Sequence, residues 1–361
     1  MLQVEYAQQI VQLLNHPLSQ AVLIIGFSEM GPVRQPVFVH GSEQAVALFG
    51  AGDLVDAYRE AYAAGGRFLY LMRLSELATD DFAAAFEAVY PVLVDLPFQY
   101  LHPARQFFDS CTCLDRLFDL CQERAALGEE THFILGCSTP GADVSGWVES
   151  LLLAARHFPV VDETGTTVYR GYHFSVVPQV AVYQDAAGDY YTASVAATYA
   201  GMISAHHAGV DLTNKSTGLL SVAPVFPEEQ LKLLSEAGYV VFTPTVRRGV
   251  AVYAAVTMTD TMSDYYRLLF YRVATDTVTR LRDVARDYLG LPASAAIGDL
   301  TFKEAVDALL RSRVAAGILR DYEFKVSYDL FKNRAFVELV LVPCGSLREI
   351  RVSTTVYVVL G

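Results

Sequence analysis

The chain has 361 residues, of which 53% are hydrophobic and 12% aromatic. This apolar content is more than one core requires, and either an oligomer or a large aromatic core fits it. Its formal net charge of −13 argues against a nucleic-acid partner, and no apolar run has the roughly 18 to 20 residues that membrane insertion requires. The first residues lack the basic start and cleavage site of a secretory signal, so we expect synthesis in the cytoplasm.

The first half of the chain alternates strand patterns with helix patterns. Residues 21–41 predict a buried strand, a turn at Gly31 and Pro32, and a second strand. Ser42 is expected to cap the next helix, which ends in a Gly-rich loop. Further along, the pattern predicts helices at 54–64, 80–88, 110–126 and 144–156 and strands at 67–74, 90–102 and 131–138. This alternation indicates an α/β layer with a covered sheet.

The middle of the chain has a different pattern of predicted secondary structure. Residues 169–183 alternate in short stretches and predict antiparallel strands, with a turn at Gly188 and Asp189 before the next strand. Residues 194–209 then predict a helix rich in Ala and Gly. Such small side chains allow a neighbouring element to approach the helix closely.

The C-terminal third predicts an α+β unit, which we expect to begin near residue 240. Two amphipathic helices, at about 264–289 and at 301–316, precede three strands. The last strand contains residues 352–360, which are uncharged, strongly β-prone and free of proline. A free edge of this kind aggregates, so we expect the strand to have a partner.

Three cysteines and two histidines form the one cluster that resembles a metal site: Cys111, Cys113, Cys121, His102 and His132. The spacing is poor, because Cys113 and Cys121 fall within one predicted helix, where small buried thiols are common. We therefore favour a structural role for these residues. The odd total of five cysteines makes free thiols the expectation.

No other pattern in the sequence predicts catalysis or a cofactor. His206 and His207 lack the spacing that places two ligands on one helical face, so we predict a capping or packing role. The Gly-rich stretches at 50–53 and 63–67 match no phosphate loop and are expected to end helices. No nucleophile elbow and no acid/base pair of carboxylates occurs. We predict no catalytic, cofactor-binding or metal residues, and no enzymatic activity.

Three stretches together resemble one known family. The first begins with an apolar strand and a turn that extends from Gly26 to Gly31 and Pro32. A helix that ends in Phe-Gly follows, and then a strand that ends at Arg73. The second comprises residues 194–216 and 228–244, and the third is the order of helix and three strands after residue 266. In order and spacing the stretches resemble the contractile tail sheath protein family. Members of that family have a longer N-terminal arm.

The resemblance implies a multi-domain sheath-like fold of class α/β plus α+β. Its parts would be an N-terminal arm at 1–20, an outer α/β domain at 21–240, an inner α+β domain facing a tube at 241–345, and an arm strand at 346–361. Such subunits stack as hexameric rings around an inner tube and contract to drive the tube through a target cell envelope. The implied partners are further copies of the chain, the tube protein, and baseplate and terminator proteins. The implied location is a phage tail or tail-like particle, assembled after synthesis in the bacterial cytoplasm.

The resemblance also implies two inter-subunit surfaces. Arms in that family add strands to the sheets of neighbouring subunits. Alternation would put five residues on one face of the C-terminal arm: Ile350, Val352, Thr354, Val356 and Val358. The second surface is helix 301–316, where Lys303, Arg311 and Arg313 would meet an acidic tube, and the alternative there is a solvated helix face. A sheath-fold cap or baseplate-proximal component remains an alternative function, as does an α/β-fold enzyme.

Overall fold

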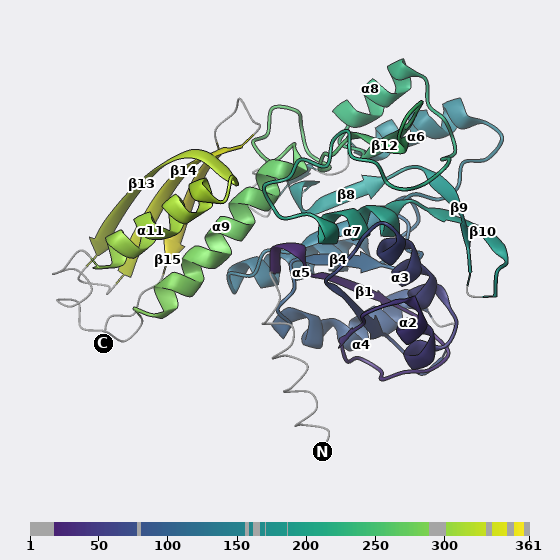
Figure 1. The fold of residues 1–361 in the computed structure, drawn as a ribbon, viewed down its shortest axis with the longest axis horizontal. Coiled ribbons are helices and arrows are strands. Elements are labelled where there is room, and N and C mark those ends of the chain that lie inside the picture. Colours follow the sequence, from purple (N-terminus) through teal and green to yellow (C-terminus); the bar gives the residue numbers. More distant parts are fainter. Residues whose placement is uncertain are drawn as a thin grey trace. The chain divides into compact units, whose positions relative to one another are not determined.

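The computed structural model describes residues 18–77, 81–155, 159–161, 167–169, 171–185, 187–288, 301–329, 334–344 and 350–356 (Figure 1). These residues form two compact units. Unit 1 contains the described residues up to 207 together with 212–266, and unit 2 contains 208–211 and the described residues from 267 onward. No helix in these ranges is both long and apolar enough to cross a membrane.

A six-stranded sheet forms the centre of unit 1. Its strands are β1 (Val22–Gly26), β2 (Val37–Phe38), β3 (Leu69–Arg73), β4 (Tyr100–Pro103), β5 (His132–Gly136) and β8 (Phe174–Val177), in the order β2-β3-β1-β4-β5-β8. All neighbours pair in parallel except β2, which is antiparallel to β3. Every residue of the five parallel strands is buried. Burial on both faces confirms the predicted α/β layer with a covered sheet.

Helices and short hairpins surround this sheet. The helices are α2 (Ser42–Phe49), α3 (Asp53–Ala63), α4 (Phe82–Asp95), α5 (Leu114–Ala126), α6 (Val144–Ala155), α7 (Ala196–Ala205) and α8 (Glu228–Glu236). The 3₁₀ turns are Leu18–Gln20 and Gly171–His173. The two-stranded pairs are β6 (Pro159–Val161) with β7 (Thr167–Tyr169), β9 (Val180–Gln184) with β10 (Tyr190–Ser194), and β11 (Val241–Thr245) with β12 (Gly249–Ala254).

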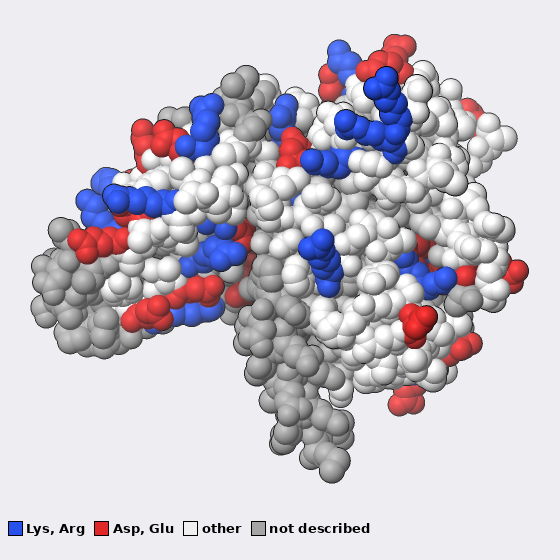
Figure 2. Space-filling model, in the orientation of Figure 1, with Lys and Arg blue, Asp and Glu red and all other residues white. Residues whose placement is uncertain are grey.

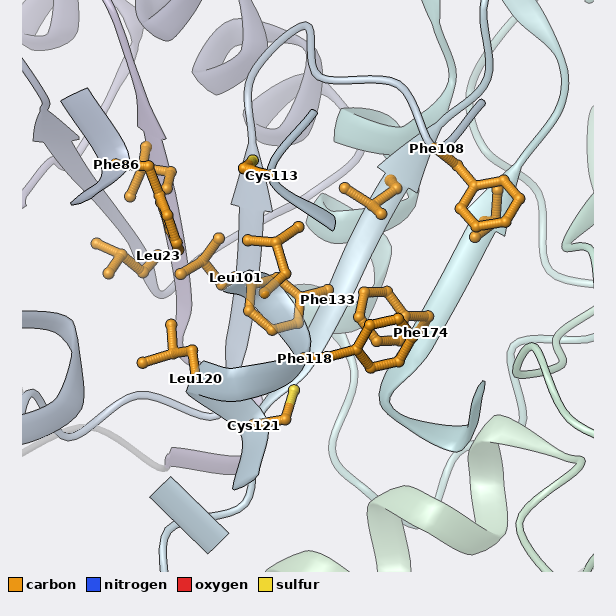
Figure 3. Close-up of a cluster of buried hydrophobic side chains, with 14 of the residues drawn as sticks. Leu23, Phe86, Leu101, Phe108, Cys113, Phe118, Leu120, Cys121, Phe133 and Phe174 are labelled. Carbon is orange, nitrogen blue, oxygen red and sulfur yellow. The ribbon is translucent and has the colours of Figure 1, made fainter. Parts of the chain in front are cut away.

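The main core lies between one face of the sheet and helices α4 and α5. Figure 3 shows side chains from the strands, such as Leu23 and Phe133, gathered with Phe86 of α4 and Phe118 of α5. The ring of Phe118 lies 4.7 Å from that of Phe174, centroid to centroid. Burial of large apolar side chains contributes about 1.5 to 3 kcal/mol each, so this cluster is a main source of stability for unit 1.

The opposite face of the sheet is covered by α3 and α7, which touch through their backbones. A Cβ atom on Gly201 of α7 would lie 2.0 Å from the carbonyl oxygen of Ala61 on α3. Real Cβ atoms do not approach an oxygen so closely, so only glycine fits at this position. The prediction that small residues let a neighbour approach this helix is thereby confirmed.

Replacing Gly201 by valine is expected to lower the free energy of unfolding by about 3 kcal/mol, because the two helices must separate. Chemical denaturation of the unassembled chain measures the loss. The matched control is Gly141→Val, since a Cβ on Gly141 has nothing within 4 Å and the change should stay within about 0.5 kcal/mol. Equal unfolding midpoints for both variants would contradict the close contact of α3 with α7.

The predicted strand at 90–102 is wrong over its first half. Helix α4 continues to Asp95 and includes Pro91, and the strand is confined to β4. The helix persists because Phe86, Val89 and Leu93 continue one buried stripe into the core.

The buried guanidinium of Arg124, on α5, stabilises the end of α4. It donates hydrogen bonds to four backbone carbonyls, those of Leu93, Val94, Leu96 and Phe98. Arg124 has 0% exposure, and its guanidinium lies 4.1 Å from the centroid of the Phe98 ring. A cation at a helix C-terminus compensates carbonyls that have no partner within the helix.

Two smaller predictions also differ from the structure. Ser42 is the first residue of α2 and not its cap; the preceding Gly41 has no capping side chain, and Gln44 Oε1 accepts a hydrogen bond from His40 N at 2.7 Å instead. Within 169–183, β8 pairs in parallel with β5, whereas β9 is antiparallel to β10, and Tyr169 at the end of β7 pairs antiparallel with β6. The predicted turn at Gly188 is present, with φ 94°.

Unit 1 extends to residue 266, beyond the predicted boundary near residue 240. The reason lies at β8, whose outer edge is covered by later parts of the chain. Val240 N donates to Val176 O, and Met258 N donates to Phe174 O, both at 2.9 Å. Residues 239–258 are thus bound to the main sheet and belong with it.

In its described residues unit 2 has two helices followed by three strands, as expected for the C-terminal third. Its elements are α9 (Leu268–Arg286), α11 (Thr301–Ala315), β13 (Leu319–Asp329), β14 (Arg334–Pro343) and β15 (Ile350–Val356). The strands form an antiparallel sheet in the order β13-β14-β15 (Figure 1). Both helices pack on this sheet, with α11 against β13 and α9 against β14 and β15.

Candidate assembly surfaces

The sheet of unit 2 has one face that packs on its own helices. On β14 the residues of this face are almost fully buried: Ala335, Val337, Leu339 and Leu341. Their register partners on β13 are only half-buried: Tyr328, Val326, Phe324 and Tyr322. Helix α11 therefore leaves part of the aromatic surface of β13 open to solvent or to another molecule.

The predicted arm residues follow the same register. Ile350, Val352, Thr354 and Val356 pair opposite Leu341, Leu339, Val337 and Ala335 in turn. The role of these residues as an inter-subunit face stays a prediction. Val358, the fifth predicted arm residue, lies outside the described residues.

The two edges of this sheet are β13 and β15, as far as the described residues extend. An edge strand presents backbone N–H and C=O groups that can pair with another chain. The structure pairs β15 with β14 of its own chain, over seven residues. Pairing of this segment with a neighbouring subunit stays a prediction.

The other face of the sheet mixes apolar and charged positions. Phe336, Val340 and Val342 of β14 are half-buried, while Glu338 between them is exposed. Lys325 Nζ lies 3.8 Å from Glu338 Oε2 across the strands. Figure 2 shows acidic and basic side chains interleaved over unit 2. A surface of mixed sign favours specific contacts over general attraction to one charged polymer.

Helix α11 carries the three basic residues predicted to contact a tube, and they do not share one surface. Lys303 and Arg311 are exposed, and Arg311 Nη2 lies 2.6 Å from Asp307 Oδ2. Arg313 is only 4% exposed. The prediction for Arg313 is therefore wrong, because its guanidinium lies inside unit 2.

Arg313 forms a buried ion pair with Asp276 of α9. The two side chains are 5% and 6% exposed, and Arg280 Nε lies 3.3 Å from the same carboxylate. Burial lowers the pKa of Arg313 to about 10, so the guanidinium stays charged at neutral pH and depends on this carboxylate. The pair joins the two helices of the unit and has a structural role.

The histidines of the suspected metal cluster are hydrogen-bonded elsewhere. His102 Nδ1 lies 2.8 Å from the carbonyl oxygen of Ile134, and burial lowers the pKa of His102 to about 4. His132 Nε2 lies 2.8 Å from Ser175 Oγ. Over the described ranges no three His, Cys, Asp or Glu side chains are placed to hold a metal ion.

The cysteines of that cluster separate into two places. Cys121 is buried on α5 and its thiol donates to the carbonyl oxygen of Thr131 at 3.7 Å. Cys111 and Cys113 lie together just before α5, with 3.1 Å between their sulfur atoms. All five cysteines are free thiols, as predicted.

His206 takes the capping role that was predicted for it. It follows the last residue of α7, and its Nδ1 lies 2.9 Å from the carbonyl oxygen of Met202. His207, the next residue, is exposed.

Sequence reasoning missed a buried charged group in unit 1. Glu60 of α3 is 2% exposed, and its Oε1 accepts hydrogen bonds from Arg105 at 2.7 Å and from Tyr191 at 2.9 Å. Burial raises the pKa of Glu60, and the charge of Arg105 offsets part of that rise. These contacts tie β10 and the loop after β4 to α3. No local pattern could reveal them, because the three residues are far apart in sequence.

Comparison with known proteins gives matches at the level of structure. No protein-family model matches the chain, and no curated protein matches it. The sheath tail protein of Desulfitobacterium hafniense is 11% identical, with a TM-score of 0.68 over 94% of this chain and 96% of that one. The sheath tail protein of Listeria innocua is 10% identical, with a TM-score of 0.67 over 98% and 99%.

A third match is an assembled sheath. The helical sheath of the anti-feeding prophage in its contracted state is 14% identical, with a TM-score of 0.67 over 94% of both chains. Each match covers at least 94% of both chains. The chain therefore has the fold of the sheath proteins of contractile tails.

Proposed function

We propose that this chain is the structural subunit of a contractile sheath, which polymerises as stacked hexameric rings around an inner tube. The observation that carries the proposal is the end-to-end match to sheath proteins, which covers 94% of this chain and 96% of the protein from Desulfitobacterium hafniense. The edge strands of the sheet in unit 2, as far as the described residues extend, support it, because an edge strand offers a line of backbone groups for pairing between subunits. The function is structural and not enzymatic.

In this proposal unit 2 is the inner domain that faces the tube, and unit 1 is the outer domain. The segment from residue 346 onward is the arm that links neighbours by strand pairing. A strand of the length of β15 forms several interchain hydrogen bonds at about 0.5 to 1.5 kcal/mol each, so repetition around a ring makes the linkage effectively permanent. Subunits linked this way rotate and slide without detaching. Contraction then releases assembly energy through new contacts, with no nucleotide consumed.

Electron microscopy of the purified full chain tests the proposal. We expect hollow, striated cylinders with six-fold symmetry in cross-section. Single rings that do not extend would instead indicate a cap or a baseplate-proximal component with the same fold. Monodisperse monomers over a wide range of concentration and salt, also in the presence of the tube protein, would overturn the proposal.

The exposed charges of α11 are the proposed contact with an acidic tube. Reversing them in Lys303→Glu with Arg311→Glu is expected to weaken extended sheath on its tube and to spare contracted, empty sheath, because only the extended state holds the tube. Co-sedimentation of sheath with tube measures this. The matched control is Lys232→Glu, because the side chain of Lys232 is exposed on α8 of unit 1. This variant should leave co-sedimentation unchanged. Unaltered tube binding in the double variant would contradict the contact.

A further inference from the structure

Two thiols lie side by side at the start of α5. Cys113 directly precedes the helix, and its carbonyl oxygen accepts the hydrogen bond of Leu117 N at 3.0 Å. Cys111 stands two residues earlier, and its sulfur lies 3.1 Å from the sulfur of Cys113. This distance brings the two sulfur atoms into contact without a covalent bond.

The turn that carries the thiols is fixed to the end of β5. Phe108 N donates to Gly136 O at 2.8 Å, and Ser138 N donates to Asp109 Oδ1 at 2.8 Å. Ser110 N closes the turn by donating to Phe107 O at 3.1 Å. With the turn fixed on one side and α5 on the other, the two sulfur atoms are held near each other in the folded chain.

The two thiols differ in their surroundings. Cys113 is 3% exposed and belongs to the core cluster drawn in Figure 3. Cys111 is half-buried, and its neighbours Ser110 and Thr112 are exposed. A small reagent in solution therefore reaches Cys111 first, and Cys113 lies directly behind it.

The chemical reactivity of the two thiols also differs, and Cys111 is again the more reactive one. The hydrogen bond between the two thiols lowers the pKa of Cys111. The same hydrogen bond, together with burial, raises the pKa of Cys113. A thiolate is the attacking species in disulfide exchange. Cys111 is thus the attacking thiol, and Cys113 is the resolving thiol.

We propose that Cys111 and Cys113 form a reversible redox pair that is oxidised by small-molecule disulfides such as glutathione disulfide. The thiolate of Cys111 attacks one sulfur of glutathione disulfide, which forms a mixed disulfide and releases one glutathione. Cys113 then loses its proton and attacks the sulfur of Cys111, which releases the second glutathione and forms the Cys111–Cys113 disulfide. Two protein thiols are oxidised and one glutathione disulfide is reduced to two glutathione molecules.

The other cysteines serve as internal controls. Cys121 and Cys137 are buried, and burial raises the pKa of Cys137, so both should stay reduced in the folded chain. Cys344, in unit 2, is half-buried like Cys111 and tests whether partial exposure alone is enough for oxidation.

The experiment incubates the full folded chain with excess glutathione disulfide and maps its peptides by mass spectrometry. We expect the peptide with Cys111 and Cys113 to lose two hydrogen atoms and to regain them with excess dithiothreitol. Cys344 should gain at most one glutathione. We also expect a thiol reagent to label Cys111 at least about tenfold faster than Cys344 at neutral pH.

A Cys111→Ser variant separates the two roles and keeps the buried Cys113 in place. In this variant Cys113 should stay reduced, because no attacking thiol remains beside it. Three results would overturn the proposal: a stable glutathione adduct on Cys111 with Cys113 reduced, both thiols still reduced under conditions that modify Cys344, or equal oxidation of Cys113 with and without Cys111.

Discussion

Replacing Arg124 by methionine is expected to lower the free energy of unfolding of unit 1 by about 4 kcal/mol. The guanidinium is fully buried and donates to the carbonyls of Leu93, Val94, Leu96 and Phe98. Each buried carbonyl left without a donor costs about 1 to 3 kcal/mol, and removal of a desolvated charge offsets part of the sum.

Fluorescence of the chain's one tryptophan measures this loss during denaturation with urea. Trp147 lies on α6 in unit 1 and stacks on Phe226, with 6.3 Å between ring centroids, so its emission reports on unit 1. The matched control is Arg116→Met on the same helix, whose side chain is 38% exposed and pairs with Glu87. Surface pairs contribute about 1 kcal/mol or less, so the control should remain close to wild type. Equal losses in both variants would mean that Arg124 does not hold the end of α4.

Deleting residues 350–361 is expected to abolish long cylinders. The deletion removes the whole of β15, which is one edge of the sheet in unit 2 and the proposed link between subunits. Negative-stain microscopy of wild-type and truncated chains at equal concentration measures the effect. Trp147 fluorescence should show that unit 1 is still folded. Cylinders of normal length from the truncated chain would contradict the arm proposal.

A pair of introduced cysteines distinguishes pairing within a chain from pairing between chains. Glu338 and Ser353 are register partners on β14 and β15, so Glu338→Cys with Ser353→Cys can be joined by a disulfide after assembly. If arms are exchanged in the cylinder, oxidation produces a ladder of covalent multimers on a denaturing gel. Cross-linked monomers alone would show that β15 stays in its own chain. Glu338→Cys alone controls for the native thiols.

Local patterns predicted the elements whose signals are local. The helix expected at 144–156 is α6 at Val144–Ala155, and the small-residue helix is α7, because the periodicity of each is complete within its own segment. The prediction failed at 90–95, where a strand was expected and α4 continues instead. The helix continues there because its buried stripe extends to Leu93, and its end is compensated by Arg124, which lies on another helix.

The buried charged residues were likewise difficult to predict from local sequence patterns. Arg313 continues the buried positions Phe302, Val306 and Leu310 at helical spacing, so periodicity alone could have placed it inside. Its partner Asp276 lies on α9, and no local sequence pattern indicates the ion pair. Glu60 and Arg105 are likewise joined only by the fold. Element order identified the fold class, whereas buried ion pairs required the three-dimensional structure.

The covering of β8 by a later segment has a consequence for synthesis on the ribosome. Phe174 and Val176 receive their outer hydrogen bonds from Met258 and Val240, so the ribosome must add more than sixty residues after Val177 before that edge can close. At roughly 5 to 20 residues per second this interval lasts several seconds. During that time the outer edge of β8 lacks its bonds to these later residues, and a strand edge left unpaired in a nascent chain is prone to aggregate.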